Sequence, residues 1–422
     1  MTDQITIAHF SDTHFGRESH HEATAPNGAP QRGVDIVRAG HAVVTDIMAR
    51  ADVPLVLHAG DVCDTPAPAM QYMVAARNEL SRLARPLSAS SRYVRQVVVI
   101  SGNHDMPRSP LVPSHLALYR GIPGVRVVTS GYTQVTFEKE VAAGTAHPSL
   151  RDVVVHALPH DDLKSTSFDD ILPVEGKVNI LLSHGVAGGS DLYFRSIGRE
   201  YPIPRDVLRR DWDYVALGHW HKRGPVFLSE KETESRVWYA GSPENTSFSD
   251  LDPDDPARGY LLVGLKRGEM PAVSRVDLPI RRMMMLPVVD AEGKTTEEIS
   301  EELLSRVQEA DEAGLLRGSI IRQRVINVLP DLWSLVDRKS AREAAAETLA
   351  YDVQPRFRGQ AAEDPGEVAD GGAETRTGEE LVRTLEKTAE DLLDEKVREP
   401  ALKVASTLLG DYLDTPVSTE ES

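Results

Sequence analysis

The sequence predicts an α/β fold built around buried, largely parallel β-strands. Short runs rich in Val, Ile and Leu alternate with longer helical segments over about the first 280 residues. Two of those segments, residues 32–50 and 68–83, have the length of helices that connect parallel strands. Strands that alternate with helices in this way are typical of sheets whose faces are covered by helices.

Five of the apolar runs are followed closely by a side chain that can bind a metal ion. The runs are residues 5–10, 54–58, 97–100, 178–182 and 214–217. Side chains just past the carboxyl ends of parallel strands gather at one edge of a sheet, so we expect these to converge. Glycines at positions 60, 102 and 218 favour the tight turns that such an arrangement requires.

The polar side chains form five motifs in a set order. They are Asp12-Thr-His14, Gly60-Asp61-x-x-Asp64, Gly102-Asn103-His104-Asp105, an isolated His184 and Gly218-His219-x-His221. Any one of them is weak, because a lone histidine beside an apolar run is usually a packing residue. Together they supply enough oxygen and imidazole ligands for two metal ions that share a carboxylate. Such a pair is the apparatus for hydrolysing a phosphate ester.

These motifs resemble those of the calcineurin-like metallophosphoesterase superfamily. The resemblance implies a four-layer sandwich, in which two β-sheets are flanked by helices. It also implies two sets of metal ligands with Asp61 in common: Asp12, His14, Asp61 and His221 for one ion, and Asp61, Asn103, His184 and His219 for the other. Mixed imidazole and carboxylate ligands favour Mn, Fe or Zn over Ca, and we expect two divalent ions, with Mn²⁺ the first choice.

The expected chemistry is attack of a metal-bridging hydroxide on a phosphodiester. Two cations about 3.5–4 Å apart lower the pKa of a bridging water and clamp both the attacking and the leaving oxygen. The resemblance gives His104 a catalytic role beside the phosphate, where it donates a hydrogen bond or a proton to the leaving oxygen. It also implies that Asp64 orients the His104 imidazole and keeps it protonated. Asp105 is expected to fix the loop.

The remaining candidates have simpler interpretations. His9 and His58 lie inside predicted strands and are expected to be packing residues near the site, whereas His160 follows a strand and could reach its rim. Cys63, the only cysteine, is expected to be a small buried filler; a single cysteine excludes a disulfide framework and fits a reducing cytoplasm. No signal peptide is expected, and no apolar run has the length of a membrane span.

The chain is too long for one core and divides into four segments. Residues 1–280 carry the motifs, and residues 281–358 suggest a small α/β capping domain with helices at 296–309 and 340–349 and strands at 319–328 and 352–357. Residues 359–376 are predicted to be an acidic linker, and residues 377–422 to be a tail of two amphipathic helices. The tail either folds back on the rest of the chain or docks another protein.

More narrowly, the layout is similar to that of the SbcD-type DNA repair nucleases. The shared features are Arg32-Gly-Val-Asp35, the Gly241-Ser-Pro-x-x-x-Ser-Phe248 block, Arg258-Gly-Tyr260 and the capping domain. This resemblance implies a Mn-dependent exonuclease and endonuclease that acts in DNA repair. The implied partners are DNA and an SbcC-like coiled-coil ABC-type ATPase, which would be bound by the C-terminal helices; a homodimer is a further expectation.

The net charge of −18 does not favour long-range attraction to a polyanion. Residues 351–422 hold 18 acidic and 8 basic side chains, so they account for −10 of that charge. DNA contact would therefore depend on local basic residues near the motifs. The candidates for substrate binding are Lys222, Arg223 and Arg17, and Arg108, Arg195 and Arg199 are also close in sequence.

Two other functions stay open at this point. A phosphodiesterase or phosphatase for small substrates, such as cyclic nucleotides, would explain the acidic charge, although it would leave the capping domain and paired terminal helices without a purpose. A non-catalytic adaptor usually has a broken ligand set, and here no expected ligand is missing.

Overall fold

The computed structural model describes residues 4–359, apart from 20–22, 27, 108, 110, 165–166, 189–201, 230–231 and 253–254. The chain separates into two units, Met1–Gly371 and Gly372–Ser422. The predicted helical tail, and all of the predicted linker after Gly359, lie outside the described residues. Within the described residues, no helix is both long and apolar enough to cross a membrane.

The first sheet has six strands in the order β12-β11-β1-β2-β3-β4. The four strands β1 to β4 are parallel, while β11 runs antiparallel to β1 and β12 antiparallel to β11. Their bounds are Ile5–Phe10 for β1, Leu55–His58 for β2, Gln96–Ile100 for β3, Val125–Val128 for β4, Arg258–Leu265 for β11 and Ala272–Leu278 for β12. The central strands are buried on both faces, which explains why their sequences are continuous apolar runs and not alternating ones.

The second sheet also has six strands, in the order β5-β6-β7-β8-β10-β9. The inner strands β6, β7, β8 and β10 are parallel, and the edge strands β5 and β9 are antiparallel to their neighbours. Their bounds are Thr133–Thr136 for β5, Val153–Leu158 for β6, Val178–His184 for β7, Tyr214–Gly218 for β8, Gly224–Pro225 for β9 and Val237–Tyr239 for β10.

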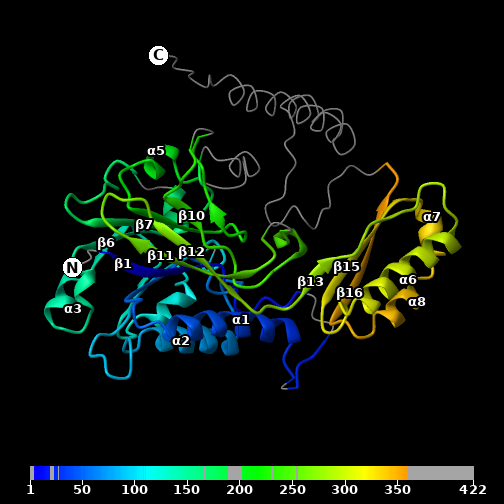
Figure 1. Cartoon of the computed structure of the whole chain (residues 1–422), viewed down its shortest axis with the longest axis horizontal. Coiled ribbons are helices and arrows are strands. Elements are labelled where there is room, and N and C mark those ends of the chain that lie inside the picture. The colour runs from blue at the N-terminus through cyan, green and yellow to red at the C-terminus, as the bar shows by residue number, and fades with distance from the viewer. Residues whose placement is uncertain are drawn as a thin grey trace, which may run out of the picture. The chain divides into compact units, whose positions relative to one another are not determined.

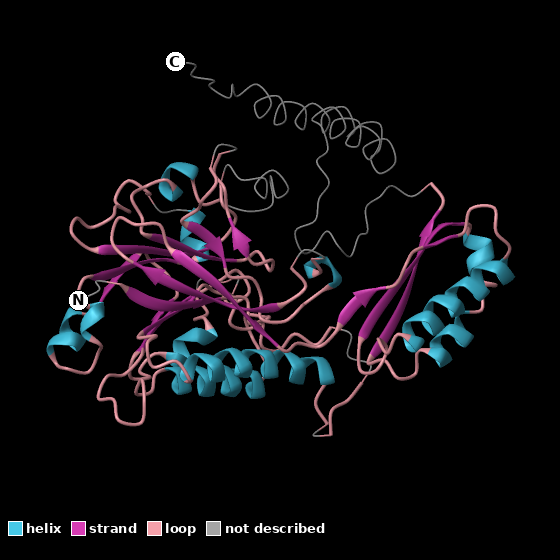
Figure 2. Cartoon of the chain, viewed as in Figure 1, coloured by secondary structure: helices cyan, strands magenta, loops and turns pink. Residues whose placement is uncertain are grey.

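The two sheets pack face to face, and helices cover their outer faces (Figures 1 and 2). One apolar cluster lies between the sheets and joins residues such as Ile7 and Leu57 of the first to Val155 and Ile180 of the second. A second cluster joins the outer face of the first sheet to the long helices α1 (Gln31–Met48) and α2 (Met70–Leu83). A third packs the short helix α5 (Arg205–Leu208) and its neighbours on the second sheet. The predicted four-layer sandwich is therefore confirmed.

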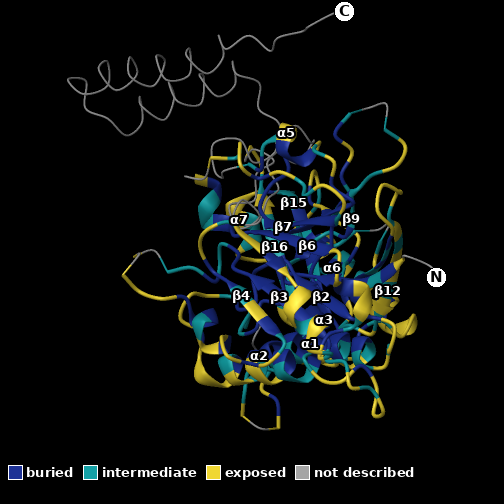
Figure 3. Cartoon of the chain, turned by 90° about the vertical axis from the view of Figure 1, so that its left-hand side faces the viewer, coloured by how far each residue is buried: buried dark blue, intermediate teal, exposed yellow. Residues whose placement is uncertain are grey.

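Shorter helices connect these layers. They are α3 (Glu138–Ala142) and the single-turn helices η1 (His115–Tyr119), η2 (Pro148–Leu150), η3 (His160–Lys164) and η4 (Phe248–Asp250). Figure 3 shows that the dark, buried residues follow the strands while exposed residues line the outer faces of α1 and α2.

Residues 281–359 form a small α/β module with an apolar cluster of its own. Its parallel strands β13 (Met283–Met285), β14 (Val289–Asp290) and β16 (Ala350–Phe357) all pair with β15 (Ile320–Val328). Helices α6 (Thr296–Glu312), α7 (Pro330–Trp333) and α8 (Arg338–Ala344) complete it. Arg281, at its start, pairs with Asp35 of α1 and donates its backbone N–H to Glu244.

Several boundaries differ from the predictions. Helix α6 continues to Glu312, and α8 ends at Ala344, five residues before its predicted end, because residues 345–349 form turns that lead directly into β16. Strand β7 does not stop at Leu182 but continues to His184, which pairs with Gly218 of β8. The isolated histidine of the motif series thus belongs to the sheet itself.

Candidate metal centre

The predicted ligands lie at the carboxyl ends of parallel strands from both sheets. Asp12 and His14 follow β1, Asp61 follows β2, and Asn103 follows β3. From the second sheet, His184 is the last residue of β7, and the pair His219 and His221 follows β8. The edges of the two sheets meet here, since the His184 imidazole Nδ1 lies 2.7 Å from the carbonyl oxygen of Ala59, after β2.

Four of these ligands have a left-handed backbone, which is uncommon for residues other than glycine. The φ angles are 53° for Asp12, 44° for His14, 53° for Asp61 and 99° for His219. Such conformations cost of order 1–3 kcal/mol each and persist where surrounding contacts impose them. Here the Asp12 N–H donates to the Gly60 carbonyl and the His14 N–H to the Asp61 carbonyl, so the two loops hold each other in shape.

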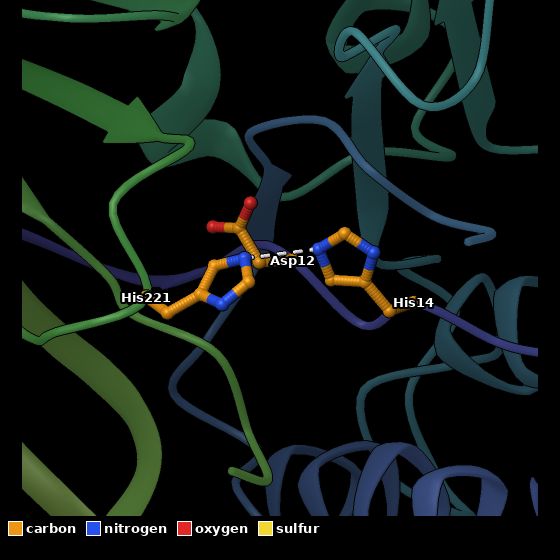
Figure 4. A group of neighbouring side chains, drawn as sticks. All are labelled: Asp12, His14 and His221. Carbon is orange, nitrogen blue, oxygen red and sulfur yellow. Dashed lines mark hydrogen bonds between the residues drawn. The ribbon is translucent and has the colours of Figure 1, made fainter. Parts of the chain in front are cut away.

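Asp12, His14 and His221 form the first group of converging side chains (Figure 4). The Nε2 atoms of His14 and His221 are 3.0 Å apart, and one Asp61 oxygen lies 3.7 Å from His14 Nε2. Asp12 and His14 are buried and His221 is half-buried. These four side chains are the set predicted for one metal ion.

Asn103, His184 and His219 form the second group. The Asn103 side-chain oxygen lies 2.9 Å from His184 Nε2 and 3.2 Å from His219 Nδ1. The Oδ2 atom of Asp61 is 3.3 Å from His184 Nε2, so one carboxylate reaches both groups. The structure therefore brings together all seven side chains that were predicted as ligands.

The electrostatics of the centre favour positive charge. Burial by itself would raise the pKa of Asp61, but His184 and His14 outweigh it and hold that pKa well below its usual range. Conversely, burial opposes protonation of His184, yet the charge and hydrogen bond of Asp61 raise its pKa to about 10. Two carboxylates, an amide oxygen and four imidazoles, with no thiolate, are a donor set that suits divalent Mn, Fe or Zn.

The imidazoles of His14, His184 and His221 each contact a further protein group through Nδ1. His184 Nδ1 donates to the Ala59 carbonyl, and His14 Nδ1 lies 3.1 Å from an Asp64 carboxylate oxygen. His221 Nδ1 is 3.2 Å from the Asp250 carboxylate. Sequence reasoning missed Asp250, although the Gly241–Phe248 block ends only two residues before it. Partners of this kind fix ring orientation in metal sites.

His104 lies beside the first group, with its ring centroid 4.8 Å from that of His14. Its backbone N–H donates to Asp61 at 2.9 Å. Its Nδ1 lies 2.7 Å from the Asp64 backbone carbonyl. Asp64, predicted to orient His104, thus contacts that imidazole through its backbone, while its carboxylate lies 3.1 Å from His14 Nδ1.

Asp105 joins the loops that follow β2 and β3. Its buried carboxylate accepts the backbone N–H groups of Val62 and Cys63 at 3.1 Å and of Gly102 at 3.0 Å. Burial and the nearby Asp61 raise the pKa of Asp105. Cys63 beside it is fully buried, and burial raises the pKa of its thiol, as expected for a packing residue and not for a nucleophile.

The basic candidates differ in their surroundings. The guanidinium of Arg223, predicted to contact substrate, is buried and pairs with Asp255 at 3.1 Å and Asp277 at 2.7 Å, so it is not placed to contact a phosphate. Arg17 lies 3.3 Å from Asp64, and Lys222 is half-buried. Positions 108, 195 and 199 are outside the described residues.

His160 is at the rim of the second group. Its ring is nearly parallel to that of His219, with centroids 6.3 Å apart, and its Nδ1 lies 3.1 Å from the His184 carbonyl. His9 is buried and contacts the Tyr214 hydroxyl at 2.9 Å. His58 lies 3.1 Å from the hydroxyl of Thr13, which separates two ligands.

A four-layer α/β sandwich with carboxylate, amide and imidazole side chains gathered at the carboxyl ends of its strands is the arrangement of a metallophosphoesterase. Residues 5–223 match the calcineurin-like phosphoesterase family, and the chain belongs to it. Membership places it among the metal-dependent enzymes that hydrolyse phosphate esters.

Relatives of the chain include DNA double-strand break repair proteins and a nuclease subunit. The DNA double-strand break repair protein Mre11 of Methanosarcina mazei is 26% identical over 319 residues, which cover 74% of this chain and 45% of that protein. Mre11 of Thermoplasma acidophilum is 27% identical over 314 residues, 73% of this chain and 74% of its own. The SbcD component of the nuclease SbcCD of Bacillus subtilis is 28% identical over 285 residues, 63% of this chain and 67% of its own. The matched part spans less than half the length of the Methanosarcina proteins.

Proposed function

We propose that the chain is a DNA nuclease of DNA repair that hydrolyses phosphodiester bonds with two divalent metal ions, Mn²⁺ first among them. The observation that carries the proposal is Asp61, whose carboxylate reaches both the His14 side and the His184 side of one cluster. The names of the relatives, Mre11 and the SbcD component of nuclease SbcCD, support DNA as the substrate.

In this proposal the residues divide into two ligand sets and one catalytic group. Asp12, His14, Asp61 and His221 hold one ion, and Asp61, Asn103, His184 and His219 hold the other. When bound, the metal pair supplies Lewis acidity that activates water and neutralises the phosphate.

His104 supplies the proton or hydrogen bond to the leaving oxygen. The hydrogen bond from its Nδ1 to the Asp64 carbonyl leaves Nε2 as the nitrogen that can face the substrate. That same bond fixes the orientation of the ring.

Lys222 is the basic side chain best placed to contact the DNA backbone. It directly follows the ligand His221, it is half-buried, and no ion pair engages it in the described part of the chain. The capping module at 281–358 would restrict which DNA ends reach the metals. The tail at 377–422 would dock a coiled-coil ABC-type ATPase.

A homodimer is also part of the proposal. Helices α2 and η1 pack together, and the Tyr119 hydroxyl donates to the Met73 carbonyl at 3.3 Å. Large apolar side chains are exposed on or beside these helices: Met70, Val74, Leu111, Val112 and Leu118. An exposed apolar patch of this kind indicates an interaction site. Light scattering should give twice the chain mass, and Leu118→Lys with Val74→Lys should give the monomer.

One observation favours a second candidate, a phosphodiesterase for small substrates. The net charge of −18 opposes approach of a polyanion, whereas it penalises a singly charged cyclic nucleotide far less.

The test is incubation of the full chain with Mn²⁺ and end-labelled linear duplex DNA at low salt, with His104→Ala as a control for contaminating nucleases. Shortened fragments with the wild type alone support an exonuclease. In a parallel incubation with circular DNA, linearisation of the circle supports an endonuclease. Intact DNA together with cleavage of bis-p-nitrophenyl phosphate would favour the small-substrate enzyme.

A further inference from the structure

Asp250 is a buried carboxylate directly behind the ligand His221. It is the last residue of η4, and its side chain is 5% exposed. One carboxylate oxygen lies 3.2 Å from His221 Nδ1. The other accepts the Thr246 N–H at 2.6 Å, the Thr246 hydroxyl at 2.8 Å and the Ser247 N–H at 3.0 Å. Its position is therefore fixed by three donors that are independent of the histidine.

The hydroxyl of Thr246 determines which nitrogen of His221 carries the proton. Its oxygen is 3.0 Å from His221 Nδ1, but its single proton is used in the bond to Asp250. It can therefore only accept from His221. Because both neighbours of Nδ1 are acceptors, Nδ1 must be the donor. The lone pair of a neutral ring then lies on Nε2, the atom that faces His14 at 3.0 Å.

Arg258 fixes the distance between the backbones of Asp250 and His221. The guanidinium is almost fully buried, and it donates to the backbone carbonyl of His221 at 2.8 Å and also to that of Asp250. A third bond, at 2.7 Å, goes to the Asn245 side chain. Buried hydrogen bonds therefore hold the backbones of Asp250 and His221 in the positions that allow their side chains to contact each other.

In the second ligand group, the His184 imidazole is held by a different kind of acceptor. His184 Nδ1 donates to the Ala59 carbonyl, a neutral acceptor, and Asn103 is a neutral ligand. In the first group, by contrast, carboxylates contact the Nδ1 atoms of two imidazoles: Asp250 contacts His221, and Asp64 contacts His14. A carboxylate that accepts from a ligating histidine increases the basicity of the ligand and adds negative charge close to the ion.

We propose that Asp250, with Thr246, is a positioning residue that holds His221 in its ligating tautomer and orientation, and that it sets the affinity of the metal site formed with Asp12 and His14 without affecting the site around Asn103. This inference rests on the proposed function, because it assumes that two ions bind. It adds a residue that the five motifs do not contain. It also predicts that one substitution changes the metal affinity of one site and not of the other.

The experiment is a titration of the full-length, metal-free chain with Mn²⁺, in which free ion is followed by electron paramagnetic resonance and heat by calorimetry. The wild type should bind two equivalents. Asp250→Asn preserves size but removes the charge, and it should weaken one equivalent by about 10–100-fold while the other changes less than about twofold. Thr246→Val keeps the carboxylate and should weaken the same equivalent by a smaller factor.

Asp255→Asn is the matched control. Its carboxylate is in the same stretch but pairs with Arg223 and Arg275, so both equivalents should keep their affinity. If Asp250→Asn weakens both equivalents equally, or neither, the inference is overturned. If that variant does not fold without metal, Thr246→Val decides, and unchanged binding in it overturns the inference. A wild type that binds fewer than two equivalents overturns the proposed function and the inference together, whereas two tight wild-type sites with unaltered variants overturn the inference alone.

Discussion

The Asp64 carboxylate lies 3.1 Å from His14 Nδ1, while the backbone carbonyl of the same residue lies 2.7 Å from His104 Nδ1. One residue thus contacts a proposed metal ligand and the proposed proton donor through different atoms. Its two roles can be separated, because a side-chain substitution removes only the first contact.

Asp64→Asn should therefore lower metal affinity but preserve turnover at saturating metal. Loss of the negative charge of Asp64 beside His14 should weaken metal binding by about 10–100-fold. The contact with His104 should persist, because it uses the unchanged backbone of residue 64. The rate should be measured as a function of Mn²⁺ concentration. A fall in kcat that excess metal does not reverse would mean that the carboxylate acts on His104 after all.

His104→Gln should leave the metal content unchanged and lower kcat by about 10²–10⁴, the usual contribution of a general acid. His104, His14 and Asp61 also lie close enough to share an ion, so the metal content is the decisive control. It can be measured by plasma mass spectrometry after dialysis. A variant that loses an equivalent of metal would make His104 a ligand.

Lys222→Gln should weaken DNA binding and reduce the slope of log K against log salt by about 1, as expected when one phosphate contact is lost. Arg223→Gln should instead lower stability, because it leaves Asp255 and Asp277 without their shared cation. Fluorescence anisotropy at several salt concentrations distinguishes the two. An unchanged slope in Lys222→Gln would place the backbone contact elsewhere.

Arg95→Met should destabilise the first domain by about 3 kcal/mol, because buried hydrogen bonds from a charged donor are lost and carbonyls at helix ends are left unpaired. The fully buried guanidinium donates to Val53 and Arg50 at 2.8 Å, Ile47 at 3.2 Å and Leu83 at 3.4 Å, so it caps the ends of both α1 and α2. Urea unfolding measures the change. The control is Arg92→Met, an exposed position three residues earlier, which should change stability by less than about 0.5 kcal/mol.

His9→Gln should make the fold less sensitive to acid. Burial between the sheets lowers the pKa of His9 to about 3, against 6.5 for a free histidine. Between these values the unfolded chain binds the proton and the folded chain does not, so stability falls as pH drops below 6.5. At pH 5 the difference amounts to about 2 kcal/mol for this residue. The loss of stability between pH 7 and pH 5 should therefore be about 2 kcal/mol smaller in His9→Gln than in the wild type. As a control, Tyr214→Phe should keep the wild-type pH dependence.

The sequence was sufficient to predict which side chains gather at the strand ends, because their identity and their place after apolar runs are both local features. Asp12, Asp61 and His219 each follow an apolar run, and parallel strands bring such positions together whatever the details of the loops. The four-layer architecture came from the family resemblance and agrees with the two packed sheets.

What the sequence could not provide are contacts between distant residues. Arg223 was predicted to bind substrate because nothing near it in the sequence indicates an ion pair. Its partner Asp277 is 54 residues away, on an antiparallel edge strand. The support of His221 by Asp250, 29 residues later, depends on how η4 folds back. Nor can a motif show whether Asp64 acts through its carboxylate or its backbone carbonyl, because a motif identifies the residue and not the atom that makes the contact.

The left-handed backbone at four of the ligands has a consequence for how the enzyme acquires its ions. Hydrogen bonds between neighbouring loops hold that shape at Asp12 and His14, so the arrangement of the ligands should be complete as soon as the sheets have formed. Chelation should then inactivate the protein without unfolding it, and the ion that occupies the cage should be decided by which metals the cell keeps free and not by which one folds the chain.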